Sequence, residues 1–320
     1  MREERLNFGI IVRVLISLLP ILFGWNLVAM IMCAYNIAMS FIICGPLTAL
    51  VSSMSAVCVS MFLHGMYGEG AKLDGLFLAL EAILCAAGCI YAIFTKKGFY
   101  KGVWLSAIGF LIPSFVSLKY YASKSGLSVA QFLAEPSFSL YKEQFTEMAK
   151  QMPDNEKLLN EVADAVYQIT ISVIPSVLII ASLVIGYIVM WCISAQLRKI
   201  PKSGIVHSFS QIRVPKTAVV IMLLSIFLYI TNMEAEIGFI FLNLFIIMFM
   251  LCAFSGISFV DFYLRKSIKS KFVRVLIYFF LNIFPLYVLI AIVDSFANFR
   301  KLTPIIVERG DSYETEKRED

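Results

Sequence analysis

Charged residues are scarce in this chain of 320 residues. Asp, Glu, Lys and Arg together make up 15% of it, whereas hydrophobic residues make up 60%. A soluble globular domain has roughly 25% charged residues, and the charges here are confined to short clusters between long apolar runs. Because backbone in lipid must satisfy its own hydrogen bonds, such runs fold as helices that cross the bilayer. The composition therefore excludes a soluble protein and predicts an all-α, polytopic integral membrane helical bundle.

Local signatures of catalysis are also missing. No GxSxG, HExxH or Walker A sequence occurs, and the two histidines, His64 and His207, lie at a predicted helix end and in a loop. Neither histidine has a carboxylate pair near it in the sequence, and without a P-loop the chain has no such route to ATP. The sequence predicts no enzyme, no catalytic residue and no cofactor. An active site assembled from distant helices leaves no local motif and stays open.

The cysteines indicate neither a disulfide framework nor a metal site. All of them fall inside apolar segments: Cys33, Cys44, Cys58, Cys85, Cys89, Cys192 and Cys252. Cys85 and Cys89 share one helix face at a spacing of four, but no His or second Cys pair lies nearby to complete a metal site. We predict that these thiols are small hydrophobic side chains within the membrane.

The basic residues follow an insertion pattern. The net charge is +5, and the Lys and Arg residues lie in short loops beside apolar segments. This is the positive-inside distribution, for which anionic lipid headgroups suffice as partners, so no nucleic acid is implied. The N-terminus leads straight into an apolar run without a small-residue cleavage site, which predicts a retained first helix rather than a signal peptide.

Hydropathy predicts about nine transmembrane helices. Their approximate bounds are 8–25, 27–44, 47–65, 75–95, 102–120, 166–195, 217–231, 237–262 and 275–297.

These segments divide the chain into four parts. They are an N-terminal membrane bundle of about five helices (1–120), an extracytoplasmic amphipathic excursion (121–165), a C-terminal bundle of about four helices (166–300) and a disordered polar tail (301–320).

Loop charges set the expected topology. The N-terminus and the basic loops at 96–101, 198–216 and 265–274 are predicted to face the cytoplasm, and the acidic or mixed loops to face outward. Nine spans then put the C-terminus outside, although Arg300 and Lys301 favour the inside. Because an odd number of spans places the two chain ends on opposite sides, we predict that the C-terminus is outside. Eight spans with one re-entrant segment are the alternative.

The excursion is the one long stretch that is not apolar. Residues 141–152 within it have the stripe of an amphipathic helix, and a second short helix is expected around 158–165 before the membrane. Acidic residues outnumber the lysines, which favours a cap on the outer face; a ligand-gating lid is the alternative. The stripe consists of Tyr141, Phe145, Met148 and Met152.

Sparse polar residues within the spans supply the candidate site. Glu81 lies about two turns into its predicted helix, where a carboxyl group must pair, take a proton or face water. The alternative is an interfacial Glu that is hydrogen-bonded to a neighbour. Asp294 lies near the end of the last helix, and Asn243 and Asn282 are typical of hydrogen bonds between helices. The candidate binding residues are Glu81, Asp294, Asn243 and Asn282.

Small residues predict one packing face. Ser52, Ala56 and Ser60 recur four apart in the helix at 47–65, so they share a face on which a neighbouring helix can approach closely.

Several stretches resemble a known family. They are FSQIRVPK (209–216), NLFIIMFMLCAFSGISF (243–259) and the ending IAIVDSFANFRKL (290–302). Together with the acidic excursion, they are similar to the YybS-like family of bacterial predicted membrane proteins, a domain of unknown function. This resemblance covers nearly the whole chain and implies a bacterial plasma membrane protein with a cytoplasmic N-terminus.

The resemblance extends distantly to the substrate-binding membrane subunits of energy-coupling-factor transporters. It implies a transport-related, solute-binding membrane subunit with an unknown small-molecule substrate, in which Glu81 lines a polar cavity. The alternative is a non-transporting membrane scaffold for envelope or division proteins, which would dock membrane or cytoplasmic partners on the basic loops and on the excursion.

Overall fold

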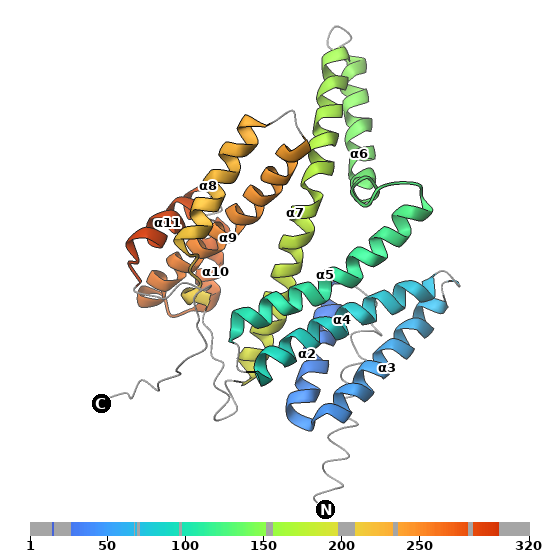
Figure 1. The fold of residues 1–320 in the computed structure, drawn as a ribbon, viewed down its shortest axis with the longest axis vertical. Helices are drawn as coiled ribbons and strands as arrows, with labels where there is room; N and C mark the ends of the chain where they lie inside the picture. The colour runs from blue at the N-terminus through green and yellow to red at the C-terminus, as the bar shows by residue number, and fades with distance from the viewer. Residues whose placement is uncertain are drawn as a thin grey trace, which may run out of the picture. The chain divides into compact units, whose positions relative to one another are not determined.

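The computed structural model describes residues 15, 27–66, 68, 71–95, 98–151, 156–197, 209–232, 236–280 and 284–300 (Figure 1). Regular structure in this described part is helical, without a strand, so the predicted all-α class is confirmed. The first predicted helix, apart from Leu15, and the polar tail at 301–320 lie outside the described residues.

The helices follow the apolar runs closely. They are α2 (Leu27–Cys44), α3 (Pro46–Gly65), α4 (Ala71–Phe94), α5 (Phe99–Lys124), α6 (Val129–Gln151), α7 (Glu156–Leu197), the short 3₁₀ turn η2 (Phe209–Gln211), α8 (Lys216–Thr231), α9 (Glu236–Ser267), α10 (Lys271–Phe280) and α11 (Phe284–Ala297).

Six of the described helices have the length and hydropathy of a membrane span: α2, α3, α4, α5, α7 and α9. Helices α8, α10 and α11 have 16, 10 and 14 residues. At 1.5 Å per residue, α10 and α11 are about 15 and 21 Å long, less than the roughly 30 Å of a bilayer core. The expected count of nine spans is therefore not confirmed.

The chain divides into two compact units, 1–206 and 207–320, each with its own apolar core. Helix α7 belongs to the first unit, whereas the sequence analysis placed this helix at the start of the C-terminal bundle. Its place follows from close packing on α5. A Cβ atom on Gly186 of α7 would lie 2.6 Å from the carbonyl oxygen of Val103, so only glycine permits this approach.

Glycines also bring α4 and α5 together. A Cβ atom on Gly88 would lie 2.6 Å from the backbone carbon of Leu105, and one on Gly109 would lie 2.4 Å from the carbonyl oxygen of Leu84. The two helices therefore touch backbone to backbone on both sides of the contact, which is how small residues stabilise helix pairs in membranes.

The predicted small-residue face on α3 is confirmed. Ser52, Ala56 and Ser60 are all buried, and the Ser60 hydroxyl donates a 2.8 Å hydrogen bond to the carbonyl oxygen of Gly75 in α4.

Helix α7 is longer than a membrane is thick. Its 42 residues span about 63 Å, roughly twice the bilayer core. Helix α6 runs alongside its N-terminal half (Figure 1), and the rings of Phe138 and Tyr167 stack with centroids 4.2 Å apart. We call α6 and residues 156–170 of α7 the α6–α7 hairpin. The short helix expected around 158–165 is thus the beginning of α7, and Tyr141 and Met148 of the predicted stripe are exposed.

The second unit is built on α9. Helices α8 and α11 both pack against it, and a Cβ atom on Gly256 would lie 1.9 Å from the carbonyl oxygen of Tyr287. The single helix expected over 275–297 is instead two helices, α10 and α11.

The end of α11 lies beside the start of α8. Arg300 donates hydrogen bonds of 2.9 Å to the carbonyl oxygens of Ser210 and Ile212, which immediately precede α8. Two faces of a bilayer are about 30 Å apart, so these segments are on the same side. The expectation that nine spans place the chain end opposite the 198–216 loop is therefore not confirmed by these contacts.

Replacing Gly109 by Ala is expected to destabilise the first unit by about 1–3 kcal/mol, because the added methyl group forces α4 and α5 apart. Denaturation of the purified protein in mixed micelles measures this. The matched control is Ile108→Ala, since the Ile108 side chain is exposed. Equal stability of the Gly109→Ala variant and the parent would contradict the close contact.

Candidate functional site

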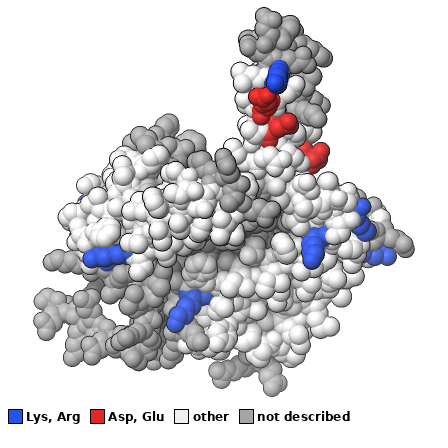
Figure 2. Space-filling model, turned by 45° about the horizontal axis from the view of Figure 1, so that its top comes forward, with Lys and Arg blue, Asp and Glu red and all other residues white. Residues whose placement is uncertain are grey.

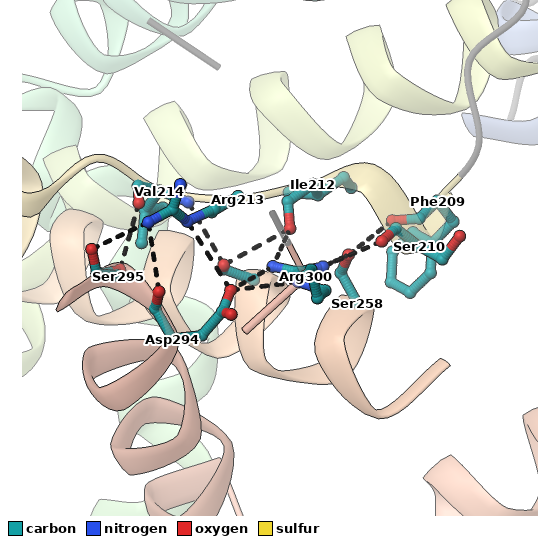
Figure 3. A network of polar contacts seen from close by, with 10 residues as sticks. Phe209, Ser210, Ile212, Arg213, Val214, Ser258, Asp294, Ser295 and Arg300 are labelled. Atoms are coloured by element: carbon teal, nitrogen blue, oxygen red, sulfur yellow. Dashed lines mark hydrogen bonds and ion pairs between the residues drawn. The ribbon is translucent and has the colours of Figure 1, made fainter. Parts of the chain in front are cut away.

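Asp294 of α11 is the centre of a buried ionic network. Its side chain is 1% exposed, and Oδ2 accepts hydrogen bonds from Arg300 Nη2 at 2.8 Å and Nε at 3.0 Å. The Arg213 Nε lies 3.8 Å from the same oxygen. Figure 3 shows Arg300 between this carboxylate and the backbone of residues 210–212. We call Arg213, Asp294 and Arg300 the Asp294 network.

A left-handed residue brings Arg300 back to Asp294. Helix α11 ends at Ala297, and Asn298 follows with a φ of 50°. Asn tolerates this conformation better than other non-glycine residues and commonly ends helices in it. The Asn298 amide donates to the Asp294 carbonyl oxygen at 2.9 Å. The chain therefore reverses sharply, and a residue six positions after Asp294 can face it.

All five N–H groups of the Arg300 guanidinium have acceptors. Nε and Nη2 donate three hydrogen bonds, two to Asp294 and one to the Ile212 carbonyl oxygen. Nη1 donates to the carbonyl oxygen of Ser210 and to Ser258 Oγ, both at 2.9 Å. Arg300 therefore has no donor left for a ligand. Its role is to join α9, α11 and residues 209–214.

Arg213 closes the end of α11. Its Nη2 donates to the carbonyl oxygens of Asp294 at 3.2 Å and Ser295 at 3.0 Å. These carbonyls belong to the last turn of the helix, where intrahelical partners run out and the helix dipole is negative. A buried cation is stabilised there, which helps to balance two arginines against one carboxylate.

Three serines satisfy the irregular backbone before α8. Ser258 Oγ donates to the Phe209 carbonyl oxygen at 2.7 Å, and Ser295 Oγ donates to that of Val214 at 3.1 Å. Ser255 Oγ accepts the Val214 amide at 3.3 Å. Non-helical backbone within a membrane protein persists only where such partners exist.

The Asp294 network is therefore a structural joint. Asp294 Oδ1 has no hydrogen-bond partner within the described part of the chain. Arg300 has no N–H group left to pair with it, because all five of its N–H groups already donate elsewhere. The predicted binding role of Asp294 does not follow from this geometry, which instead fixes three segments of the second unit.

A second network surrounds Asp261 of α9. Its Oδ1 accepts from Tyr278 at 2.6 Å and lies 3.0 Å from Arg274 Nε, while Oδ2 accepts from Arg265 Nε at 2.8 Å. Arg274 Nη1 also donates to the Ile268 carbonyl oxygen at 2.8 Å. This Asp261 network holds α10 against the C-terminal end of α9.

Glu81 differs from both aspartates. It is 8% exposed in α4, and Oε1 accepts a 2.8 Å hydrogen bond from Ser114 of α5. Among the described residues it forms no ion pair. The hydrogen bond to a neighbour that the alternative prediction for Glu81 called for is therefore present. A neutral hydroxyl, however, cannot compensate a carboxylate charge in the membrane.

Further polar contacts follow the α4–α5 seam. Tyr121 donates to Asp74 nearer the helix end, and Ser106 Oγ donates to the Cys85 carbonyl oxygen at 2.9 Å and lies 2.8 Å from Cys89 Sγ. On α4 these contacts are at Asp74, Glu81, Cys85 and Cys89, spacings of seven, four and four residues that keep them on one helix face.

Asn243 does not join either site. Asn243 Nδ2 donates to the Phe239 carbonyl oxygen at 2.8 Å within its own helix. It is fifteen residues before Ser258 in α9, about 22 Å along the helix axis, and so lies far from the Asp294 network. Asn282 lies outside the described residues.

The sequence alone did not single out four residues that meet in or beside the Asp294 network: Arg213, Ser255, Ser258 and Ser295. A signal was present, because all of them fall within the three stretches on which the family resemblance was based. In the structure, FSQIRVPK, the AFSGISF part of α9 and VDSFANFR meet around one network.

Replacing Asp294 by Asn is expected to cost about 3–5 kcal/mol, because two buried arginines lose their counter-charge. Denaturation of the purified protein in mixed micelles measures the loss. Glu161→Gln is the control, since the Lys157–Glu161 pair at 3.9 Å is exposed and such pairs contribute little. An Asp294→Asn variant as stable as the parent would show that the network is not a joint.

Comparisons with known proteins give one match. A family model described as "Predicted membrane protein (DUF2232)" matches residues 8–295. Neither the comparison with curated proteins nor that with solved structures found a match. The matched range ends directly after Asp294 and includes all six candidate membrane spans.

Proposed function

Because the chain belongs to the DUF2232 family of predicted membrane proteins, we propose that it is a transport-related, solute-binding membrane protein in which Glu81 binds a proton or a monovalent cation. The supporting observation is a buried carboxylate within a candidate span that has a hydroxyl beside it but, among the described residues, no cation.

The contrast among buried acids supports this assignment. Three carboxylates are buried in the described part of the chain: Glu81, Asp261 and Asp294. Both aspartates face arginines within 3.0 Å, so their charges are compensated by the fold. Glu81 is compensated only when a proton or cation binds, and an intramembrane acid of this kind is a functional hypothesis by default.

Its position on the α4–α5 seam also supports the proposal. Ser114 Oγ lies within hydrogen-bond distance of two acceptors, Glu81 Oε1 at 2.8 Å and the Phe110 carbonyl oxygen at 2.9 Å. This hydroxyl can change its acceptor between the two as the charge of Glu81 changes. A bound Na⁺ would likewise use the carboxylate and hydroxyl oxygens, which are hard ligands suited to it.

Glu81→Gln is expected to abolish cation-dependent behaviour while the protein still folds, because Gln keeps the hydrogen bond from Ser114 but has no charge. The measurement is the shift in thermal stability of the nanodisc-embedded protein when Na⁺ replaces a large organic cation, repeated at several pH values. The parent should show a shift and the variant none.

The matched control is Asp74→Asn, because Asp74 is also on α4 and also accepts from a hydroxyl of α5, but lies near the helix end. This variant should retain the parent's response. A parent protein that responds to neither Na⁺ nor pH, or a Glu81→Gln variant that responds as the parent does, would overturn the proposal.

The α6–α7 hairpin favours the alternative function, a membrane scaffold. Figure 2 shows acidic side chains gathered on this protruding hairpin, and those exposed are Glu135, Glu147, Glu161 and Asp164. Apolar side chains beside them are also exposed, among them Leu158, Val162 and Ile169. An acidic surface with exposed apolar residues suits a basic protein partner.

If the scaffold proposal holds, reversing the charges with Glu161→Lys and Asp164→Lys abolishes association with that partner without changing membrane insertion. Cross-linking in the native membrane, followed by mass spectrometry of the purified protein, measures the partners. Lys157→Gln, which changes one exposed charge of the opposite sign on the same helix, is the control. An identical set of cross-linked partners for parent and variant would count against the scaffold.

A further inference from the structure

Helix α10 has an apolar surface that takes no part in the two ionic networks. Phe272 is 72% exposed and Leu276 is 38% exposed, and Val273 between them is exposed as well. These positions lie on one side of a ten-residue helix, with Arg274 buried on the other. Such a helix is amphipathic in an unusual sense: its polar residues face the protein and its apolar residues face outward.

The orientation of α10 is fixed by its polar side. Arg274 and Tyr278 both contact Asp261, and Arg274 also donates to the Ile268 carbonyl oxygen. Since these contacts are buried and charged, α10 cannot turn its apolar side inward without leaving Asp261 unpaired. The exposure of Phe272 and Leu276 is therefore a stable property of the fold.

Basic residues directly precede this apolar surface in the sequence. Residues 265–274 contain five Lys and Arg residues and no acid: Arg265, Lys266, Lys269, Lys271 and Arg274. Lys266 and Lys269 are exposed, and the Lys266 ammonium lies 5.1 Å from the ring centre of Tyr263 and 5.5 Å from that of Phe262. Arg265 and Arg274 share the one negative charge of Asp261, and Lys266 and Lys269 form no ion pair within the described part of the chain, so this corner has a net positive charge.

The position of this surface relative to the membrane follows from α9. The candidate span in α9 ends at Ser267 with Arg265 and Lys266 in its last turn, and α10 begins at Lys271; a basic corner of this kind is typical of the membrane interface. At about 15 Å, α10 is too short to cross.

We propose that residues 266–276 bind an anionic phospholipid at the membrane interface, with Phe272 and Leu276 among its acyl chains and Lys266 and Lys269 at its phosphate. Charge complementarity selects the lipid, because an uncompensated pair of lysines beside an exposed apolar face matches a phosphate joined to hydrocarbon. A soluble anion as the occupant would leave Phe272 in water. A second copy of the chain would bring two positively charged corners together, and these would repel each other.

The occupant is identified by photo-cross-linking. The variant Phe272→p-benzoylphenylalanine keeps an aromatic group at the exposed position, and irradiation in vesicles of phosphatidylglycerol and phosphatidylethanolamine should yield an adduct with the mass of one phospholipid. The same amino acid at Tyr141, which is exposed on the α6–α7 hairpin, is the control and should give far less. A cross-linked dimer in place of a lipid adduct would overturn the proposal.

Headgroup selectivity is tested by native mass spectrometry of the detergent-purified protein with added phosphatidylglycerol or phosphatidylcholine. The parent should retain phosphatidylglycerol preferentially, and Lys266→Gln with Lys269→Gln should weaken that binding by about fivefold for each lysine. Lys101→Gln, at an exposed lysine of the first unit, is the matched control.

Three results would contradict the lipid site. They are equal retention of the two lipids by the parent, unchanged retention by the double variant, and stabilisation of the parent by inorganic phosphate as strong as that by phosphatidylglycerol. None of these measurements depends on Glu81, so this site and the proposed function succeed or fail separately.

Discussion

The second unit depends on satisfying the hydrogen bonds of residues 209–214, which are mostly buried and consist of the short 3₁₀ turn η2 followed by three residues outside any helix. A helix satisfies its own backbone, but this segment cannot, and membrane-embedded or buried carbonyls without donors are costly. Ser255, Ser258, Ser295 and Arg300 supply the partners. Because those side chains come from α9, from α11 and from the turn after α11, meeting this requirement also fixes how the helices pack. The helix pair α9 and α11 can approach so closely only because Gly256 has no side chain.

The buried charges of the second unit follow from this same need for hydrogen-bond donors. A guanidinium offers the five donors that the segment needs, but it brings a positive charge, and Asp294 together with the negative end of α11 compensates it. The Asp261 network repeats the arrangement where α10 meets α9, with two arginines around one buried carboxylate. In both networks the charge is a consequence of the packing. Glu81 differs from both aspartates, because Ser114 donates a hydrogen bond to it but does not neutralise its charge. The functional proposal is centred on Glu81 for this reason.

The sequence correctly predicted those properties that depend on local composition. The apolar run at 27–44 is helical throughout, and the spacing of Ser52, Ala56 and Ser60 correctly predicted a buried face. It failed where distant segments decide the outcome. Residues 275–297 are apolar almost throughout, so hydropathy indicates one helix and cannot show that α10 and α11 are separate. Asp294 was recognised as unusual, but its partners lie 81 residues away at Arg213 and beyond the turn at Asn298, and only the fold reveals that it is a joint.

The return of α11 also resolves a conflict in the charge pattern. Nine spans had put Arg300 and Lys301 on the acidic side, against the tendency of basic residues to stay in the cytoplasm. Arg300 contacts Ser210 and Ile212 before α8, and Ser258, which contacts Phe209, is only a few residues before the basic end of α9. All three basic stretches of this unit therefore lie at one end.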